Sequence, residues 1–235
     1  MISLSVFVMG LNAQTRIKVM SFNLHAAQDA SIARIAEFIK AQDADLVAIQ
    51  EIDYYTKRSG RQSDNNTDML TELAYRTGMQ GMFFPIIEVH GGKYGNAILS
   101  RYGMEKTENI LLPHVTGTEQ RAASVCKLTL DDGTKITFVS THIDVANAEN
   151  GMNQFKKLNE LFAGKDPVVL GGDLNKRNNT NEITELKKIW EIAVNDYFDY
   201  VAFTPKTSWR IIEQKVFTNT NLSDHNPVMV TLELK

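Results

Sequence analysis

The sequence predicts an α/β sandwich in which two mostly β sheets pack against each other and helices lie outside them. Many short runs rich in β-branched residues, bounded by turn formers, indicate strands throughout the chain. Fewer segments repeat apolar residues with helical spacing, and several of these precede a strand run. Strands joined partly by hairpins and partly through helices are typical of sheets covered by helices.

The strand runs begin near the N-terminus and continue to the C-terminal end. They cover residues 16–23, 45–50, 82–89, 96–100, 109–113, 122–130, 135–141, 167–172, 214–218 and 227–234. A turn at Asp131-Asp132-Gly133 joins two of them as a hairpin. Helices are predicted over 32–41, with Ser31 as the capping residue, and over 67–77, 148–162 and 182–192.

The composition is that of an ordinary globular protein and limits the possible functions. The 235 residues carry a formal charge of -3, so no general attraction to nucleic acid is expected. The single cysteine, Cys126, lies in an apolar strand run and is interpreted as a buried structural thiol. No repeat or linker divides the chain, so residues 15–235 are expected to form one domain.

The first fourteen residues are apolar and end in small and polar ones, as in a secretory signal. We interpret residues 1–14 as the remnant of such a signal, which predicts export to the periplasm or the extracellular space. The positively charged leader is missing. A first β-strand in a cytoplasmic protein is therefore the alternative, and no segment is long enough to span a membrane.

Polar side chains recur where the predicted strands end or begin. They are Asn23, Glu51, Asn96, His142, Asp173, Asn175, Asp224 and His225. Ligands of open α/β sheets bind at the ends of strands, so we expect these side chains to gather at one site. In the stretch Gly-Gly-Asp-Leu-Asn, alternation along the chain places Asp173 and Asn175 on one side and turns Leu174 into the core.

Six motifs occur in a fixed order from Val19 to Val230. They are FNLH, LVAIQEID, YGNAILSRY, STHID, GGDLN and SDHNPV. Together they resemble the endonuclease/exonuclease/phosphatase family, the metal-dependent hydrolases that are similar to deoxyribonuclease I. This resemblance implies a four-layer α/β/β/α sandwich of two mainly antiparallel sheets, which agrees with the fold class indicated by the patterns.

The resemblance also implies a metal site for Mg²⁺ or Mn²⁺. Glu51 would be the metal ligand with Asn23 beside it, and Asp224 would lie near the metal. A hard cation of this kind keeps several water molecules, so one or two carboxylates are enough to bind it. Asp224 and His225 are neighbours in the chain and point different ways on an extended strand, so another acidic group is expected to support His225.

The remaining catalytic roles follow from the same resemblance. Asp173 would orient or deprotonate the attacking water, and Asn175 would donate a hydrogen bond to the phosphate as charge develops there. His142 and His225 would contact the phosphoryl oxygens, and protonation would strengthen both contacts.

Three further residues are predicted to bind substrate, each with a structural alternative. Asn96 would orient a catalytic neighbour or make a hydrogen bond at the start of a strand. Asp144 would join the site or cap a loop. Arg58 would reach a substrate phosphate or lie solvated in its loop. His25 is a further candidate for lining the pocket, whereas His90 and His114 are expected to be surface histidines.

One family feature is not found by these patterns. The family carries an Arg-apolar-Asp-Tyr strand upstream of Ser-Asp-His, and its aspartate supports the active-site histidine. The one arginine between Thr204 and Ser223 is Arg210. Two isoleucines and then Glu213 follow it, where the family pattern has an apolar residue and then Asp-Tyr. We therefore predict a gap between Thr204 and Trp209, where two consecutive Cα atoms lie much farther apart than the usual ~3.8 Å because a strand is skipped.

The sequence thus predicts a phosphoesterase that attacks a phosphodiester or phosphomonoester with an activated water. Its substrate would be a phosphorylated small molecule, a lipid head group or a nucleic acid. A monomer with no stable protein partner is expected. A non-catalytic member of the fold that binds phosphate or nucleic acid is the alternative if the strand is missing. A glycosidase with paired carboxylates would leave both histidines unexplained.

Overall fold

A computed structural model describes residues 14–58, 66–164 and 166–235 of the chain. Apart from Gln14, the predicted signal segment lies outside the described residues. One sheet consists of β1 (Arg16–Asn23), β2 (Leu46–Tyr54), β3 (Gln80–Val89), β4 (Gly92–Ser100), β11 (Trp209–Val216) and β12 (Val228–Leu234). The other consists of β5 (Met104–Leu111), β6 (Ala122–Thr129), β7 (Lys135–His142), β8 (Val168–Asp173), β9 (Glu191–Asp196) and β10 (Asp199–Thr204).

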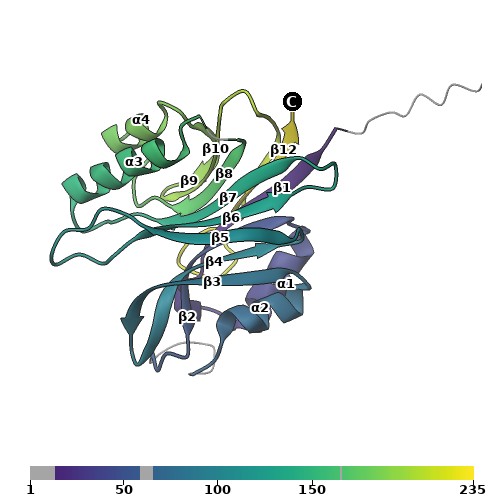
Figure 1. The fold of residues 1–235 in the computed structure, drawn as a ribbon. Helices are drawn as coiled ribbons and strands as arrows, with labels where there is room; N and C mark the ends of the chain where they lie inside the picture. The colour runs from purple at the N-terminus through teal and green to yellow at the C-terminus, as the bar shows by residue number, and fades with distance from the viewer. Residues whose placement is uncertain (1–13, 59–65, 165) are drawn as a thin grey trace, which may run out of the picture.

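Helices cover the outer face of each sheet. The helices are α1 (Ile32–Gln42), α2 (Met69–Thr77), α3 (Ala148–Phe162) and α4 (Asn181–Leu186), with a short 3-10 helix, η1 (His25–Ala27). Figure 1 shows α1 and α2 on one side of the paired sheets and α3 and α4 on the other. Among the described residues, no helix combines the length and apolar character needed to cross a bilayer.

Three layers of buried apolar side chains hold these four layers together. One lies between α1, α2 and the first sheet and includes Phe22 and Ile35. The second lies between the sheets and includes Phe138 and Trp209. The third lies under α3 and α4 and includes Phe155. The predicted α/β/β/α sandwich is therefore confirmed.

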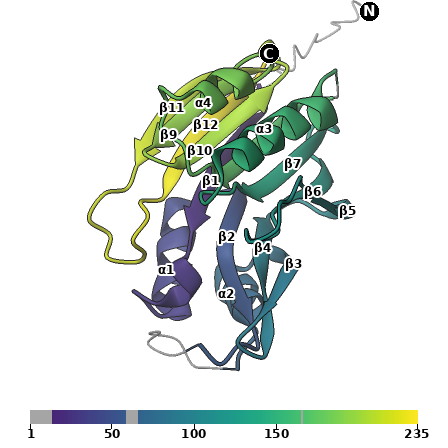
Figure 2. The same ribbon diagram turned by 90° about the vertical axis from the view of Figure 1, so that its left-hand side faces the viewer.

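The loop after β11 reaches the first helical layer, and Figure 2 shows it beside α1. Phe217 in this loop packs edge-on against Phe38 of α1, with 5.2 Å between the ring centroids. The loop leads to the segment before β12 that carries His225. Aromatic packing therefore helps to fix the approach of this segment to the sheet.

Each sheet contains one parallel pair of strands at its centre, and the other pairs are antiparallel. Helix α1 joins β1 to β2, and α3 joins β7 to β8, as parallel neighbours require a crossover connection. The pairing sets Asn23 opposite Gln50, next to Glu51, and sets His142 opposite Asp173. Asn23, His142 and Asp173 are therefore the last residues of β1, β7 and β8, and Glu51 lies beside Asn23 within β2.

Gly171 allows the sheets to approach closely behind these strand ends. A Cβ atom at this position would lie 2.5 Å from Cβ of Ala48 in the opposite sheet, which is too close for any side chain. The neighbouring contacts between the sheets are polar, since Gln50 Nε2 donates to Ser140 Oγ at 3.2 Å. The glycines of the Gly-Gly-Asp-Leu-Asn stretch thus belong to the packing that supports the strand end.

The structure corrects the prediction over residues 182–192. Helix α4 ends at Leu186, and Glu191 begins β9. The patterns also missed β10, which follows at Asp199–Thr204 and is buried along its whole length. For residues 191–192, pairing in the edge strand β9 overrides the helical spacing of the apolar residues.

Candidate active site

A polar cleft of about 490 Å³ opens at the carboxyl ends of β1, β2, β7 and β8. The predicted site residues that line it are Glu51, Arg58, His142, Asp173, Asn175 and His225. His25, a weaker candidate, also lines the cleft, as does His90, which was expected to be an ordinary surface residue. The expectation that residues at strand ends gather in one place holds for this set.

Asn23 contacts two of the carboxylates of the cleft, Glu51 and Asp173. Its side chain is fully buried, and Nδ2 donates to Glu51 Oε1 at 3.0 Å and to Asp173 Oδ2 at 2.9 Å. Its Oδ1 accepts from the backbone N–H of His25 at 2.9 Å. Asn23 therefore lies between the Glu51 and Asp173 carboxylates, and its side-chain oxygen faces away from both of them.

Four residues that line the cleft, His25, Glu51, His90 and Asn175, have an unusual backbone conformation with positive φ. Glu51 has φ of 54° and lies where the pairing of β2 with β4 shifts register, between Ile49 and Ile52. Asn175 has φ of 51° just after β8. Positive φ is uncommon for residues other than glycine, and bulges of this kind redirect a side chain. The side chains of Glu51 and Asn175 are thereby aimed into the cleft instead of along the strand faces.

Asp173 is the most buried carboxylate of the cleft, at 1% exposure. Oδ1 accepts from the backbone N–H of Asn175 at 2.9 Å, and Oδ2 lies 3.4 Å from His142 Nε2 and 3.7 Å from His225 Nε2. Burial raises the pKa of Asp173 above its ordinary value, against the opposing effect of His225. A carboxylate with a raised pKa is a stronger base.

His225 is paired with Asp199, the first residue of β10. Nδ1 of His225 donates to Asp199 Oδ2 at 2.7 Å. Burial opposes a charge on the ring, but the hydrogen bond and the negative charge of Asp199 outweigh it and raise the pKa of His225 to about 9. His225 therefore carries a proton on both ring nitrogens at neutral pH, and Nε2–H faces Asp173.

His142 has a different environment, in which no carboxylate contacts Nδ1. That nitrogen lies 3.2 Å from NH1 of Arg121, and Nε2 lies 2.9 Å from the Asn175 side-chain nitrogen. Burial, and then the positive charge of Arg121, lower the pKa of His142 well below its ordinary value. The expectation that protonation strengthens both histidines is therefore supported for His225 but not for His142.

Asp224 does not lie with Glu51, as its predicted role near the metal requires. Its side chain is 54% exposed, and Oδ1 is 3.5 Å from Nδ1 of His25. It groups with His25 and Asp29, separately from Glu51, His142 and Asp173. The structure does confirm that an acidic group other than Asp224 supports His225.

Two of the predicted substrate-binding residues are buried outside the cleft. Asn96 donates from Nδ2 to Ser124 Oγ at 3.2 Å, between the two sheets. Asp144 accepts from the backbone N–H of Ala146 at 2.8 Å and from Asn150 Nδ2 at 2.7 Å, ahead of α3. The structure places neither side chain in the cleft. Asn96 makes a contact between strands and Asp144 caps a loop, which were the structural alternatives for these two residues.

Arg58 does line the cleft, but its guanidinium group is held in place. Nε donates to Asp53 Oδ2 at 3.0 Å, NH2 donates to Oδ1 at 3.3 Å, and the group lies 5.6 Å from the centre of the Tyr94 ring. Tyr94 also lines the cleft, and burial followed by the charge of Glu51 raises its pKa. Tyr94 is the first residue of the YGNAILSRY motif, which was the available signal, but the sequence analysis did not assign it to the site.

The strand that seemed to be missing is β10. The chain continues from β10 to β11 through a turn, in which the N–H of Ser208 donates to the carbonyl of Pro205 at 3.0 Å, so the predicted gap is wrong. The sequence Phe198-Asp199-Tyr200 supplies the apolar-Asp-Tyr pattern, with Tyr197 where the family has arginine. This pattern could have been found by searching upstream of Thr204.

The cleft offers a suitable set of donors for a divalent cation. Ligand atoms of Glu51, His142 and Asp173 all lie within 4.8 Å of one another. Mg²⁺ and Mn²⁺ prefer oxygen ligands, which Glu51 and Asp173 provide. The neutral amide of Asn23 lies between Glu51 and Asp173, and the charge of Glu51 helps to raise the pKa of Asp173 although His225 opposes this rise. A cation would relieve the repulsion between the two carboxylates.

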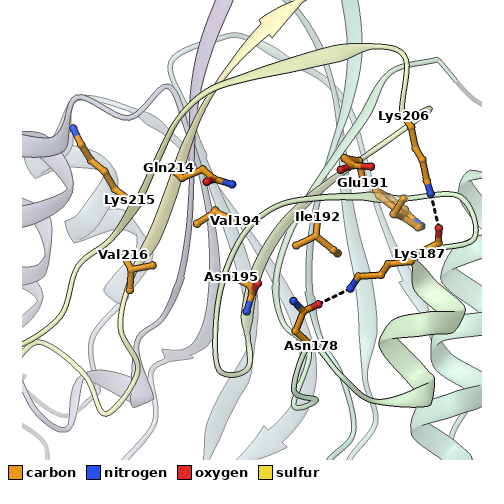
Figure 3. Close-up of a pocket in the computed structure, with 11 residues that line it drawn as sticks. Asn178, Lys187, Glu191, Ile192, Val194, Asn195, Lys206, Gln214, Lys215 and Val216 are labelled. Carbon is orange, nitrogen blue, oxygen red and sulfur yellow. Dashed lines mark hydrogen bonds between the residues drawn. The ribbon is translucent and has the colours of Figure 1, made fainter.

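A larger cavity, of about 530 Å³, lies at the edge strands β9 and β11. Figure 3 shows that Lys187 there donates to Asn178 Oδ1, at 2.7 Å, and Lys206 donates to the carbonyl of Lys187, at 2.7 Å. Glu191 is the one carboxylate among its described lining residues, which include no histidine. This cavity therefore offers fewer groups for metal binding or acid–base catalysis than the smaller cleft.

Comparison with known proteins identifies the class. The model of the endonuclease/exonuclease/phosphatase family matches residues 20–225, so the chain belongs to this family, whose members are hydrolases of phosphoester bonds. A search of curated proteins finds no match to the sequence.

Solved structures of the family share this fold at low sequence identity. A family protein from Beutenbergia cavernae is 20% identical, with a TM-score of 0.79 over 93% of this chain and 72% of its own. A mannosyl-6-phosphatase from Bacteroides thetaiotaomicron is 16% identical, with a TM-score of 0.74 over 92% and 99%. The human Nocturnin catalytic domain, solved with a sulfate anion, is 19% identical, with a TM-score of 0.71 over 94% of each chain.

Proposed function

We propose that this protein is a divalent-metal-dependent phosphoesterase that uses an activated water for in-line attack on phosphorus. The observation that carries the proposal is the position of Asp173. It is a buried carboxylate with a raised pKa, in the same cleft as Glu51 and within 3.7 Å of an imidazolium ring, that of His225. A base, a metal ligand and a charged hydrogen-bond donor are the groups that phosphoester hydrolysis requires.

Glu51 would hold Mg²⁺ or Mn²⁺. Asn23 lies beside it and donates from Nδ2 to both Glu51 and Asp173, so it orients the two carboxylates. The bound cation would neutralise charge on the phosphoryl oxygens. Asp224 is not proposed as a ligand of this ion, because it lies with His25 at the edge of the cleft.

Asp173 orients and deprotonates the attacking water. Burial disfavours its charged form, so the deprotonated carboxylate has a strong tendency to accept a proton. The N–H of Asn175 and Nδ2 of Asn23 each donate to one of its oxygens, which fixes the plane of the group. The base is therefore positioned before the substrate binds.

The histidines and Asn175 bind the phosphoryl oxygens. His225 brings a positive charge, held by Asp199, that balances the negative charge developing in the transition state. His142 acts as a neutral hydrogen-bond donor from the other wall of the cleft. The Asn175 amide lies between His142 and the carbonyl of Ile143, from which it can turn toward the substrate.

A phosphorylated small molecule is the substrate class to test first. A cleft of about 490 Å³ falls within the range typical of small-molecule sites. A lipid head group or a nucleic acid remains a second candidate on the basis of the family. A non-catalytic phosphate-binding protein was favoured only if the support of His225 were missing, and Asp199 provides that support.

Hydrolysis of a panel of phosphomonoesters and phosphodiesters, after removal of metal by a chelator, tests the proposal. We expect release of phosphate or alcohol from at least one substrate class when Mg²⁺ or Mn²⁺ is added back, and none without a divalent ion. Binding of phosphate esters without turnover at any metal concentration would contradict catalysis and support the non-catalytic alternative.

We further propose that the protein is exported, on the basis of the apolar segment over residues 1–14. Cell fractionation should find the protein, shortened at its N-terminus, in the periplasm or the medium. A full-length chain in the cytoplasm would contradict export.

A further inference from the structure

Arg121 contacts His142 in a way that limits where the histidine can carry its proton. The arginine lies immediately before β6, whose pairing with β7 places Ala123 opposite Thr141. The side chain is 8% exposed, NH1 lies 3.2 Å from Nδ1 of His142, and NH2 lies 3.1 Å from Glu119 Oε2. The guanidinium group is thus held between an outer carboxylate and the inner histidine.

An arginine side chain can only donate hydrogen bonds, and it stays charged in proteins. NH1 of Arg121 therefore contacts Nδ1 favourably only when that nitrogen has a free lone pair. The single proton of the neutral ring must then be on Nε2. From there it points toward the cleft, where Asp173 Oδ2 lies at 3.4 Å.

One neighbour favours the opposite arrangement. The Asn175 side-chain nitrogen, which donates to the carbonyl of Ile143 at 3.0 Å, lies 2.9 Å from Nε2 of His142. Donation from this amide would place the proton on Nδ1, directly against the guanidinium of Arg121. A half-turn of the amide would present its oxygen to Nε2–H at the loss of its bond to the Ile143 carbonyl, whereas an arginine has no acceptor to offer in any orientation. Arg121 therefore decides the arrangement.

We propose that Arg121 is a positioning residue that fixes the proton of His142 on Nε2 and so aims an N–H group at the bound phosphoryl oxygen. The two histidines of the cleft then act differently. His225 is held by a carboxylate and brings a charge, and His142 is held by a cation and brings a neutral donor. The catalytic part of this inference rests on the proposed phosphoesterase function, whereas the proton position does not.

The proton position can be measured in the wild-type protein without any substrate. In long-range ¹H–¹⁵N spectra of protein labelled in its histidines, protonated and unprotonated ring nitrogens resonate at distinct frequencies. The signals of His142 are assigned as those lost in His142→Gln. We expect an unprotonated Nδ1 and a protonated Nε2. A protonated Nδ1 in the wild-type protein would overturn the proposal.

Variants of Arg121 test the cause. Arg121→Ala should shift the His142 signals toward a mixture of the two proton positions, and Arg121→Lys, which keeps a cationic donor, should retain more of the wild-type pattern. Arg58→Ala is the matched control, because it removes another arginine of the cleft that is tied to Asp53 and not to His142. An unchanged His142 pattern in Arg121→Ala would contradict the proposal, as would an equal change in Arg58→Ala.

Kinetics on an active substrate then test the catalytic consequence. Arg121→Ala should lower kcat by about tenfold or more while KM changes little, as expected when a donor is lost mainly from the transition state. Added guanidinium ion should restore part of kcat in Arg121→Ala and have no such effect on wild type. A raised KM with unchanged kcat would assign Arg121 to substrate binding instead. If no substrate is found, the phosphoesterase function fails, and the spectra still decide the proton position.

Discussion

Asp199 Oδ2 lies 2.7 Å from Nδ1 of His225, and this contact links a strand end of the second sheet to the segment just before the last strand of the first. Asp199 is 3% exposed, so its carboxylate has little contact with water and acts mainly on the ring. The contact orients Nε2 of His225 toward Asp173, the base in our account.

The pH dependence of activity should follow this contact. The pKa of His225 is raised from 6.5 to about 9, so the imidazolium is present below that pH and is lost as the pH rises through it. We expect kcat/KM of the wild-type enzyme to fall on the alkaline side near pH 9. Asp199→Asn should move this fall to lower pH, because the amide no longer stabilises the ring charge.

Asp196→Asn provides the matched control for that shift. Asp196 lies at the end of β9 and accepts from Asn226 Nδ2 at 2.9 Å, without touching His225. Its pH profile should match that of wild type. Identical alkaline limbs in wild type and Asp199→Asn would show that His225 does not carry the charge that the reaction needs.

Metal binding should depend on Glu51. Glu51→Gln removes a ligand charge and keeps the shape of the side chain, so calorimetric titration should show weaker binding of Mg²⁺ or Mn²⁺ with little change in Tm. Glu119→Gln is the control, since Glu119 also lines the cleft but pairs with Arg121 outside the proposed ligand set. Equal metal affinity in wild type and Glu51→Gln would remove Glu51 from this role.

The close approach of the two sheets should depend on Gly171. A methyl group there would lie 2.5 Å from Cβ of Ala48, so Gly171→Ala forces the sheets apart. We expect the free energy of unfolding to fall by about 1–3 kcal/mol, the usual range for overpacking, as measured by denaturant titration. Gly103→Ala should have almost no effect, because no atom would lie within 4 Å of its new Cβ. Equal stability of wild type and Gly171→Ala would contradict the packing described here.

The parts of the fold that the sequence predicted are those whose signals are local. Ser31 caps α1 as expected, accepting from the N–H of Arg34, and the predicted range 148–162 coincides with α3. By contrast, Trp190 and Ile192 continue a helical spacing that the chain abandons after Leu186. Only the sheet that Glu191–Asp196 joins makes this segment a strand, and a local pattern carries no such information.

For the site as well, some residues could be predicted from the sequence and others could not. Glu51 and Asp173 directly follow predicted strand runs, and the packing of the two sheets brings their strands, β2 and β8, together. Asp144 follows a strand as well, but its carboxylate accepts hydrogen bonds from the N–H of Ala146 and from Asn150 Nδ2, so it caps a loop. Arg121 precedes a strand but lies outside all six motifs, so the resemblance gave no reason to single it out. The direction of each side chain depends on loop geometry and on register, which these motifs do not specify.

The single measurement that tests the central claim most directly is the turnover rate of Asp173→Asn under single-turnover conditions, with saturating Mg²⁺ and an active phosphoester. Asp144→Asn is the control, because Asp144 is equally buried and likewise accepts two hydrogen bonds, but lies outside the cleft. We predict a rate for Asp173→Asn that is lower by about 10²–10⁴-fold, the usual contribution of a general base, and a rate for Asp144→Asn near that of wild type. If Asp173→Asn keeps more than about a tenth of the wild-type rate, less than ~1.4 kcal/mol of the barrier depends on it, and Asp173 is not the base.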